Sequence, residues 1–169
     1  MLTTLILQDD PALSSALSHA VTAYGFEPEI FASARAAWDR LQQRPVDLVI
    51  ASFLIKRAGG FTPEGALVLV NKMRMNAQNV DGAWMVDAPD RAWMGRVPVI
   101  VTHDAPRSVR ALDPERLMRR LDVAAIMRHP LDCDAIARRG RELVDAATVE
   151  RAALFAPSRS AFGAIAARS

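Results

Sequence analysis

The chain has 169 residues, of which 51% are hydrophobic and 24% charged, a composition typical of a folded domain rather than a disordered one. Its 21 basic residues nearly balance 19 acidic ones, which does not favour a nucleic-acid partner. The single cysteine, Cys133, excludes an internal disulfide and an all-cysteine metal site. No apolar run approaches the roughly 18 residues of a membrane span, and no signal-peptide pattern is present. We therefore expect a cytoplasmic protein without a membrane partner.

Strand and helix patterns alternate along the chain. Short apolar runs predict strands at 3–7, 26–32, 47–54, 97–102 and 123–127. Apolar residues at helical spacing, bounded by capping residues, predict helices at 11–24, 33–45, 62–76, 113–121 and 132–154. The third helix is expected to begin with Thr62 as its N-cap, after a loop at 57–60. Buried strands that alternate with helices predict an α/β fold, a doubly wound parallel sheet with helices on both faces.

Such a sheet places its chemistry at the carboxyl ends of its strands. The polar residues expected there are Gln8, Asp9, Asp10, Ser52, Thr102, His103 and His129. The two aspartates are candidates either for metal ligands or for capping the helix that follows. Thr102 is expected to hold a loop through a local hydrogen bond. Asp9, His103 and His129 could together bind a transition metal, but no dense ligand motif supports this, and we expect no metal or cofactor.

Four features of residues 3–146 resemble a response-regulator receiver domain (CheY-like). They are the acidic cluster after the first strand, the DLVIAS strand, the VPVIVT strand, and the stretch His129-Pro130-Leu131-Asp132. The resemblance implies a receiver- or flavodoxin-like sheet of five parallel strands in the order 2-1-3-4-5. It also implies self-catalysed phosphotransfer from a histidine kinase to an aspartate that ends strand three, with Mg²⁺ held by acidic residues after strand one.

The positions that would carry this chemistry are changed. Ser52 stands in the place of the phosphoacceptor aspartate and His129 in that of a lysine, whereas Thr102 fits the family. The acidic pair after strand one corresponds to Gln8-Asp9 or, shifted by one residue, to Asp9-Asp10. A serine without a base is a poor nucleophile, and an amide in place of a carboxylate weakens Mg²⁺ binding. These departures predict a degenerate receiver that is not an enzyme and has no catalytic residue.

Two segments exceed what a receiver-like domain at 1–146 needs. An insertion at 77–96 carries the tripeptide Ala-Trp-Met twice, and 147–169 forms an alanine-rich helical extension or tail. Tryptophan and methionine are common at the centres of interfaces. The expected contact residues are therefore Trp84, Met85, Trp93 and Met94. The alternative is that both tryptophans fold back onto the third helix as a satellite core.

The sequence thus predicts a pseudo-receiver signalling module of a bacterial two-component-type pathway. It would act through phosphorylation-independent contact with a protein partner. The resemblance also implies the fourth and fifth helices as a face for a homodimer. The alternative function is a small-ligand or metal-binding domain that uses Asp9, Ser52, His103 and His129.

Overall fold

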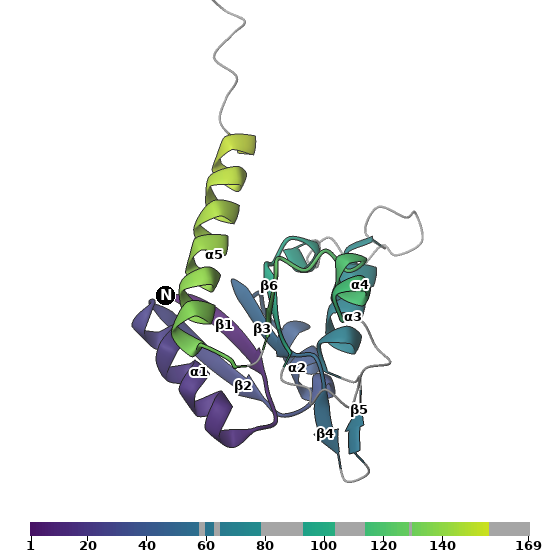
Figure 1. Ribbon diagram of the computed structural model, residues 1–169. Helices are drawn as coiled ribbons and strands as arrows, with labels where there is room; N and C mark the ends of the chain where they lie inside the picture. The colour runs from purple at the N-terminus through teal and green to yellow at the C-terminus, as the bar shows by residue number, and fades with distance from the viewer. Residues whose placement is uncertain (58–59, 63–64, 79–92, 104–113, 129, 156–169) are drawn as a thin grey trace, which may run out of the picture.

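The computed structural model describes residues 1–57, 60–62, 65–78, 93–103, 114–128 and 130–155 (Figure 1). Its central sheet has five parallel strands in the order β2-β1-β3-β6-β7. The strands are β1 (Leu2–Leu7), β2 (Phe26–Phe31), β3 (Leu48–Ser52), β6 (Val99–His103) and β7 (Ala125–Arg128). Since β6 and β7 are the fourth and fifth strands of this sheet along the chain, the predicted order 2-1-3-4-5 is confirmed.

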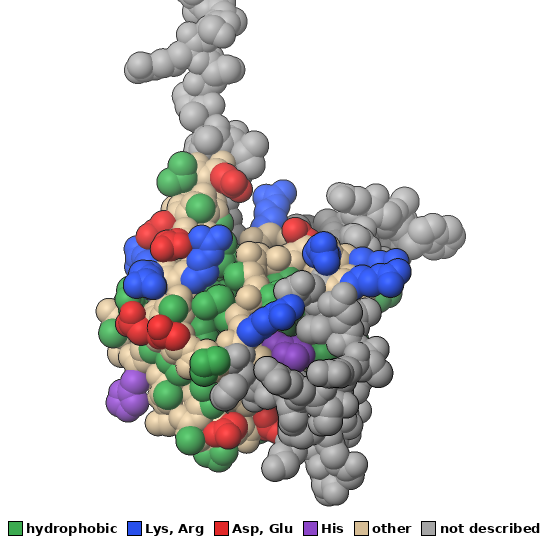
Figure 2. All heavy atoms as spheres, in the orientation of Figure 1, with side chains coloured by type: hydrophobic (Ala, Val, Ile, Leu, Met, Phe, Trp, Pro, Cys, Tyr) green, Lys and Arg blue, Asp and Glu red, His purple; other side chains and the backbone are tan. Residues whose placement is uncertain are grey.

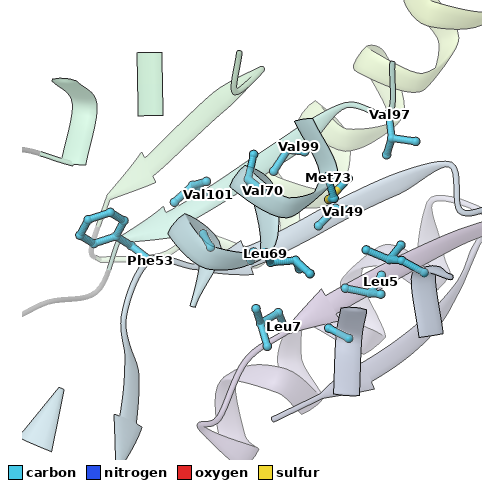
Figure 3. Packing of buried hydrophobic residues seen from close by; sticks show 14 of the residues in the cluster. Leu5, Leu7, Val49, Phe53, Leu69, Val70, Met73, Val97, Val99 and Val101 are labelled. Atoms are coloured by element: carbon cyan, nitrogen blue, oxygen red, sulfur yellow. The ribbon is translucent and has the colours of Figure 1, made fainter. Parts of the chain in front are cut away.

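Helices cover both faces of the sheet. One face packs against α1 (Pro11–Ala23) and α5 (Cys133–Phe155), in a core that includes Ile6, Ile50 and Ile100. The other face packs against α2 (Ala34–Leu41), α3 (Ala66–Gln78) and α4 (Pro114–Arg119). Figure 3 shows strand side chains of this second core beneath Leu69, Val70 and Met73 of α3. Successive strand residues point to opposite faces, so the apolar runs fill both cores.

Side-chain caps fix where the first two helices begin. The Asp10 carboxylate accepts hydrogen bonds from the backbone N–H groups of Ala12 and Leu13, at 2.8 and 3.0 Å. Ser33 Oγ accepts one from Ala36 N at 3.3 Å. Each cap satisfies N–H groups that have no partner within the helix. Pro11 also suits the first turn of α1, where a missing N–H group costs nothing.

Helix α5 is long and lies very close to the sheet. It runs for 23 residues, through residue 146, and rises past the edge of the sheet (Figure 1). Gly140 makes the approach possible, because a Cβ atom there would lie 2.5 Å from Leu48 Cδ2 of β3. No helix among the described residues is both long and apolar enough to cross a membrane. The division of the chain at 146–147 stays a prediction.

The segment between β3 and α3 differs from the sequence prediction. The third strand ends at Ser52, and the chain then forms an antiparallel pair, β4 (Ile55–Arg57) and β5 (Gly60–Thr62). Thr62 pairs with Ile55 within this hairpin, and α3 begins only at Ala66. Thr62 as an N-cap was therefore wrong. The backbone of Thr62 is used in a strand, and Arg57 and Gly60, the ends of the expected loop, pair with one another in the hairpin.

Candidate functional site

The strand register brings the predicted polar residues to one edge of the sheet. Ser52 of β3 lies directly opposite Thr102 of β6, which in turn lies opposite Met127 of β7. Leu7 pairs with Ala51, so Gln8 leaves β1 at the level of Ser52. Because side chains alternate along a strand, Gln8, Ser52 and Thr102 share the face that packs against α1 and α5. The register therefore places these three residues at the same edge of the sheet.

Ser52 is buried and its hydroxyl is already used. The side chain is 1% exposed, and Oγ donates a hydrogen bond of 2.7 Å to the carbonyl oxygen of Leu54. The next residue, Phe53, donates its backbone N–H to the carbonyl oxygen of Thr102 at 2.8 Å. The first bond closes a turn after β3, and the second joins the residue after β3 to β6. Ser52 therefore acts as a small buried residue whose hydroxyl stabilises a turn.

Gln8 presents a donor where a metal site would need an acceptor. Its Oε1 accepts a hydrogen bond from Asp10 N at 3.1 Å. Its Nε2 is buried and has no hydrogen-bond partner in the part of the chain that the structure describes. An amide nitrogen does not bind Mg²⁺, which takes oxygen ligands. Exchanging the two amide atoms would sacrifice the bond to Asp10 N, so the hydrogen bonding fixes this orientation.

The two aspartates after β1 have different surroundings. Asp10 is exposed and caps α1, as the capping interpretation predicted. Asp9 is half-buried beside it. The carboxylate of Asp10 is used in the helix cap, and Gln8 has an amide in place of a carboxylate. The ligand set for a divalent cation at this position is therefore weak.

Thr102 differs from its expected role. Its side chain is 1% exposed, and Oγ1 has no hydrogen-bond partner among the described residues. The expected bond from this hydroxyl to a loop is therefore absent from that part of the chain. It is the Thr102 carbonyl oxygen, not the hydroxyl, that joins β6 to the turn after Ser52.

The metal candidates are not brought together among the described residues. His103 is half-buried, and its ring lies 5.4 Å from the ring of Phe53 between centroids, at an interplanar angle of 34°. His129 lies outside the described residues. Within residues whose placement is given, no three histidine, cysteine, aspartate or glutamate side chains are close enough to hold a metal ion.

Arg128 is a residue of this edge that the sequence analysis did not single out. It ends β7, is exposed, and lies opposite His103 in the register of the sheet. The signal for it was the basic pair at 128–129 before Pro130, of which only His129 was considered. Arg128 gives this edge a permanent positive charge, which a histidine provides only in part near neutral pH.

The structure gives the expected contact residues different surroundings. Met94 is completely buried in the core beside α3, so its assignment as a contact residue was wrong. Its side chain fills space within the domain and has no surface to offer to a partner. Trp93 is half-buried against the same core, as in the satellite-core alternative. Trp84 and Met85 lie outside the described residues.

No family model and no curated protein matches this sequence. Solved structures do match. The response regulator receiver domain protein (CheY-like) from Methanospirillum hungatei JF-1 has a TM-score of 0.65 at 14% identity, over 89% of this chain and 98% of that chain. The signal receiver domain of a signal transduction histidine kinase from Syntrophus aciditrophicus has a TM-score of 0.60 at 19% identity, over 86% of this chain and 92% of that chain.

An orphan response regulator of H. pylori is a third such structure, with a TM-score of 0.58 at 15% identity over 85% of this chain and 96% of that chain. Two of these neighbours are receiver domains and the third is a response regulator, and each is covered over at least 92% of its own length. The fold prediction is therefore confirmed. Identities this low establish the fold and leave the chemistry to the residues at the site.

Proposed function

We propose that this chain is a receiver-like signalling module of the two-component type. It acts through contact with a protein partner and is not phosphorylated at the end of β3. The observation that carries the proposal is the buried Ser52 hydroxyl, which donates to the carbonyl oxygen of Leu54 at 2.7 Å. The receiver fold of the structural neighbours supports the signalling role.

Phosphoryl transfer to Ser52 lacks its chemical requirements. A serine nucleophile needs a base that removes its proton. The neighbours that the structure describes on the same face are the Gln8 amide and the Thr102 hydroxyl, and neither is a base. The amide oxygen of Gln8 is already used by Asp10 N, and the amide group that remains is the nitrogen, which does not bind Mg²⁺. The developing phosphoryl charge would therefore lack the divalent cation that usually neutralises it.

A partner can replace phosphorylation as the signal. A domain with two conformations shifts toward the one that a partner binds better. A preference of about 100-fold for one conformation changes the ratio of the two by the same factor. The signal would then be the presence or absence of the partner, and the sequence at the former phosphorylation site would only set the resting balance.

Intact-mass spectrometry after incubation with acetyl phosphate and Mg²⁺ tests the proposal. We expect the wild-type chain to gain no species of about 80 Da, the mass of a phosphoryl group. Ser52→Asp is the matched variant, because it restores the carboxylate at the same position. An adduct on the wild type that disappears in Ser52→Ala would contradict the proposal.

A second candidate function is binding of a small ligand in the same place. Gln8 Nε2 and Thr102 Oγ1 are both buried without a partner among the described residues, and such groups usually find one in a ligand or an ordered water. A thermal-shift screen with Mg²⁺, Zn²⁺ and nucleotides separates the two functions. A pure interaction module gives no shift, whereas a ligand-binding domain gives a higher melting temperature.

A further inference from the structure

A cavity of about 620 Å³ lies at the opposite edge of the sheet from Ser52. It opens where β6 and β7 begin, and residues of α5 between 143 and 150 form one wall. Figure 1 shows α5 rising past the sheet. Val97 and Pro98 precede β6 on one side, and Ala146 and Ala147 line the α5 side. Small side chains on α5 leave room for another chain to approach the helix closely.

The floor of the cavity is held rigid by Arg74 of α3. Its guanidinium donates to the carbonyl oxygens of Met94, Gly95, Val97, Leu121 and Asp122, at distances from 2.8 to 3.5 Å. All five N–H groups of the side chain are thereby used. Burial lowers the pKa of Arg74. Arg74 therefore joins two turns of the chain and has no donor left for a ligand.

Two other charges in the cavity are available. Arg96, in the turn before β6, and Glu150, on α5, are both exposed and both line the cavity. Neither has an ion-pair partner in the described part of the chain. Closer to the middle of α5, by contrast, Arg139 pairs with Glu142 and Arg141 with Asp145. Figure 2 shows side chains of both charges over this helix.

The same end of α5 carries an apolar side chain that the described part of the chain leaves largely exposed. Val149 is 68% exposed, one residue before Glu150. An exposed valine beside a cavity with alanine and valine in its walls is an apolar surface that a protein contact would cover. The cavity lining itself has two basic and two acidic residues, Arg74, Arg96, Asp122 and Glu150. It therefore has no net charge that would select an acidic or a basic partner.

We infer that the occupant is a second copy of this chain. Around a two-fold axis the same surface meets itself, so each contact occurs twice. Glu150 of each copy then faces Arg96 of the other, and the exposed α5 ends with Val149 cover one another's alanine surface. A lining with both signs of charge is self-complementary in this arrangement. The inference does not depend on the phosphorylation state of Ser52, and it places the dimer at the amino end of the sheet instead of on the fourth helix.

Charge reversal tests the pairing. Light scattering after size exclusion should show a concentration-dependent dimer for the wild-type chain. Glu150→Arg alone, or Arg96→Glu alone, places like charges opposite each other twice in the dimer. Exposed ion pairs are individually weak, so we expect each single reversal to raise the dimer dissociation constant about tenfold. The double variant, with both charges reversed, should restore the wild-type value.

Mixing the two single variants gives the most specific result. A pair made of one Glu150→Arg chain and one Arg96→Glu chain has opposite charges at both contacts, so the mixture should dimerise more tightly than either variant alone. Arg138→Glu, at an exposed position of α5 outside the cavity, is the control and should leave the dimer unchanged. A wild-type chain that stays monomeric, or single reversals without effect, would overturn the inference.

Discussion

Gly65, the residue before α3, lies against the carbonyl oxygen of Ser52 at the end of β3. A Cβ atom at position 65 would overlap that oxygen and would also come within 3.0 Å of the carbonyl oxygen of Phe53. The absence of a side chain at Gly65 lets α3 begin directly over the polar edge of the sheet. The turn after Ser52 and the start of α3 are therefore packed backbone to backbone.

Gly65→Ala should destabilise the fold more than Gly140→Ala does. At position 65 the new methyl group meets backbone atoms, which cannot move without shifting β3. At position 140 it meets Leu48 Cδ2, the end of a side chain that can turn, and the helix gains from alanine. We expect a loss of about 2–3 kcal/mol for Gly65→Ala. Urea unfolding of the two variants measures the difference, and equal losses would contradict the explanation.

Arg74→Met should lower the free energy of unfolding by about 3 kcal/mol, because five carbonyl oxygens, four of them in partly buried hydrogen bonds, lose a charged donor. Arg74→Lys keeps the charge but cannot reach five carbonyl oxygens, so we expect an intermediate loss. Chemical denaturation measures both. Arg35→Met, at an exposed position of α2, is the control and should change stability by less than about 0.5 kcal/mol. A Lys variant as stable as the wild type would show that charge alone is sufficient.

The ion pairs of Glu29 should make stability fall in acid. Burial raises the pKa of Glu29, but hydrogen bonds and charge from Arg40 and Arg44 outweigh it, and the net pKa is below the ordinary value of 4.5. Arg40 Nη2 and Arg44 Nη2 donate to Glu29 Oε1 at 2.9 and 2.6 Å. A carboxyl group with a lowered pKa in the folded state stabilises the fold above its unfolded pKa. This contribution is lost as the pH falls through the folded pKa.

The measurement is thermal unfolding of the wild type and Glu29→Gln between neutral pH and about pH 3. The variant should be less stable at neutral pH, and its deficit should shrink as the pH falls below 4.5, the ordinary value for glutamate. Glu27→Gln is the control, since Glu27 is exposed on the same strand. A deficit that stays constant with pH would show that the ion pairs contribute nothing to the acid dependence.

Local patterns predicted much of this fold. Apolar runs located all five strands of the parallel sheet, and capping was one of the two roles expected for Asp10, because a helix follows it. The hairpin between β3 and α3 was missed, since each of its strands has only three residues and their signal is a glycine pair that equally suits a loop. Thr62 resembled a helix start because a threonine followed by a proline is also typical of an N-cap and first turn.

Long-range contacts could not be predicted from one sequence. Arg74 binds carbonyl oxygens that are 20 to 48 residues away along the chain, and nothing near position 74 indicates them. The Ala-Trp-Met repeat suited an interface and a core equally, and burial of Met94 depends on where α3 lies. The polar edge was predictable because the ends of parallel strands meet by topology, whereas the direction of each polar atom there depends on the turn that follows.

Thr102→Val tests whether the unpaired hydroxyl at this edge has a hidden partner. Valine has nearly the same shape, so the substitution removes a buried polar group that has no partner among the described residues. We expect stability to stay the same or to rise by up to about 1 kcal/mol. Thr4→Val is the matched control: Thr4 is equally buried, but its Oγ1 donates to the carbonyl oxygen of Leu48 at 3.3 Å. It should lose about 1 kcal/mol.

Denaturant unfolding of both threonine variants decides between two states of the site. A neutral or stabilising Thr102→Val means that the hydroxyl is unpaired in solution, as expected for an interaction module with an unused pocket. A loss as large as that of Thr4→Val would mean that water or a bound molecule pairs with Thr102. The thermal-shift screen would then identify the molecule if its signal disappears in Thr102→Val. Such a result would favour the ligand-binding function, because a buried polar group gains stability only from a partner that it binds.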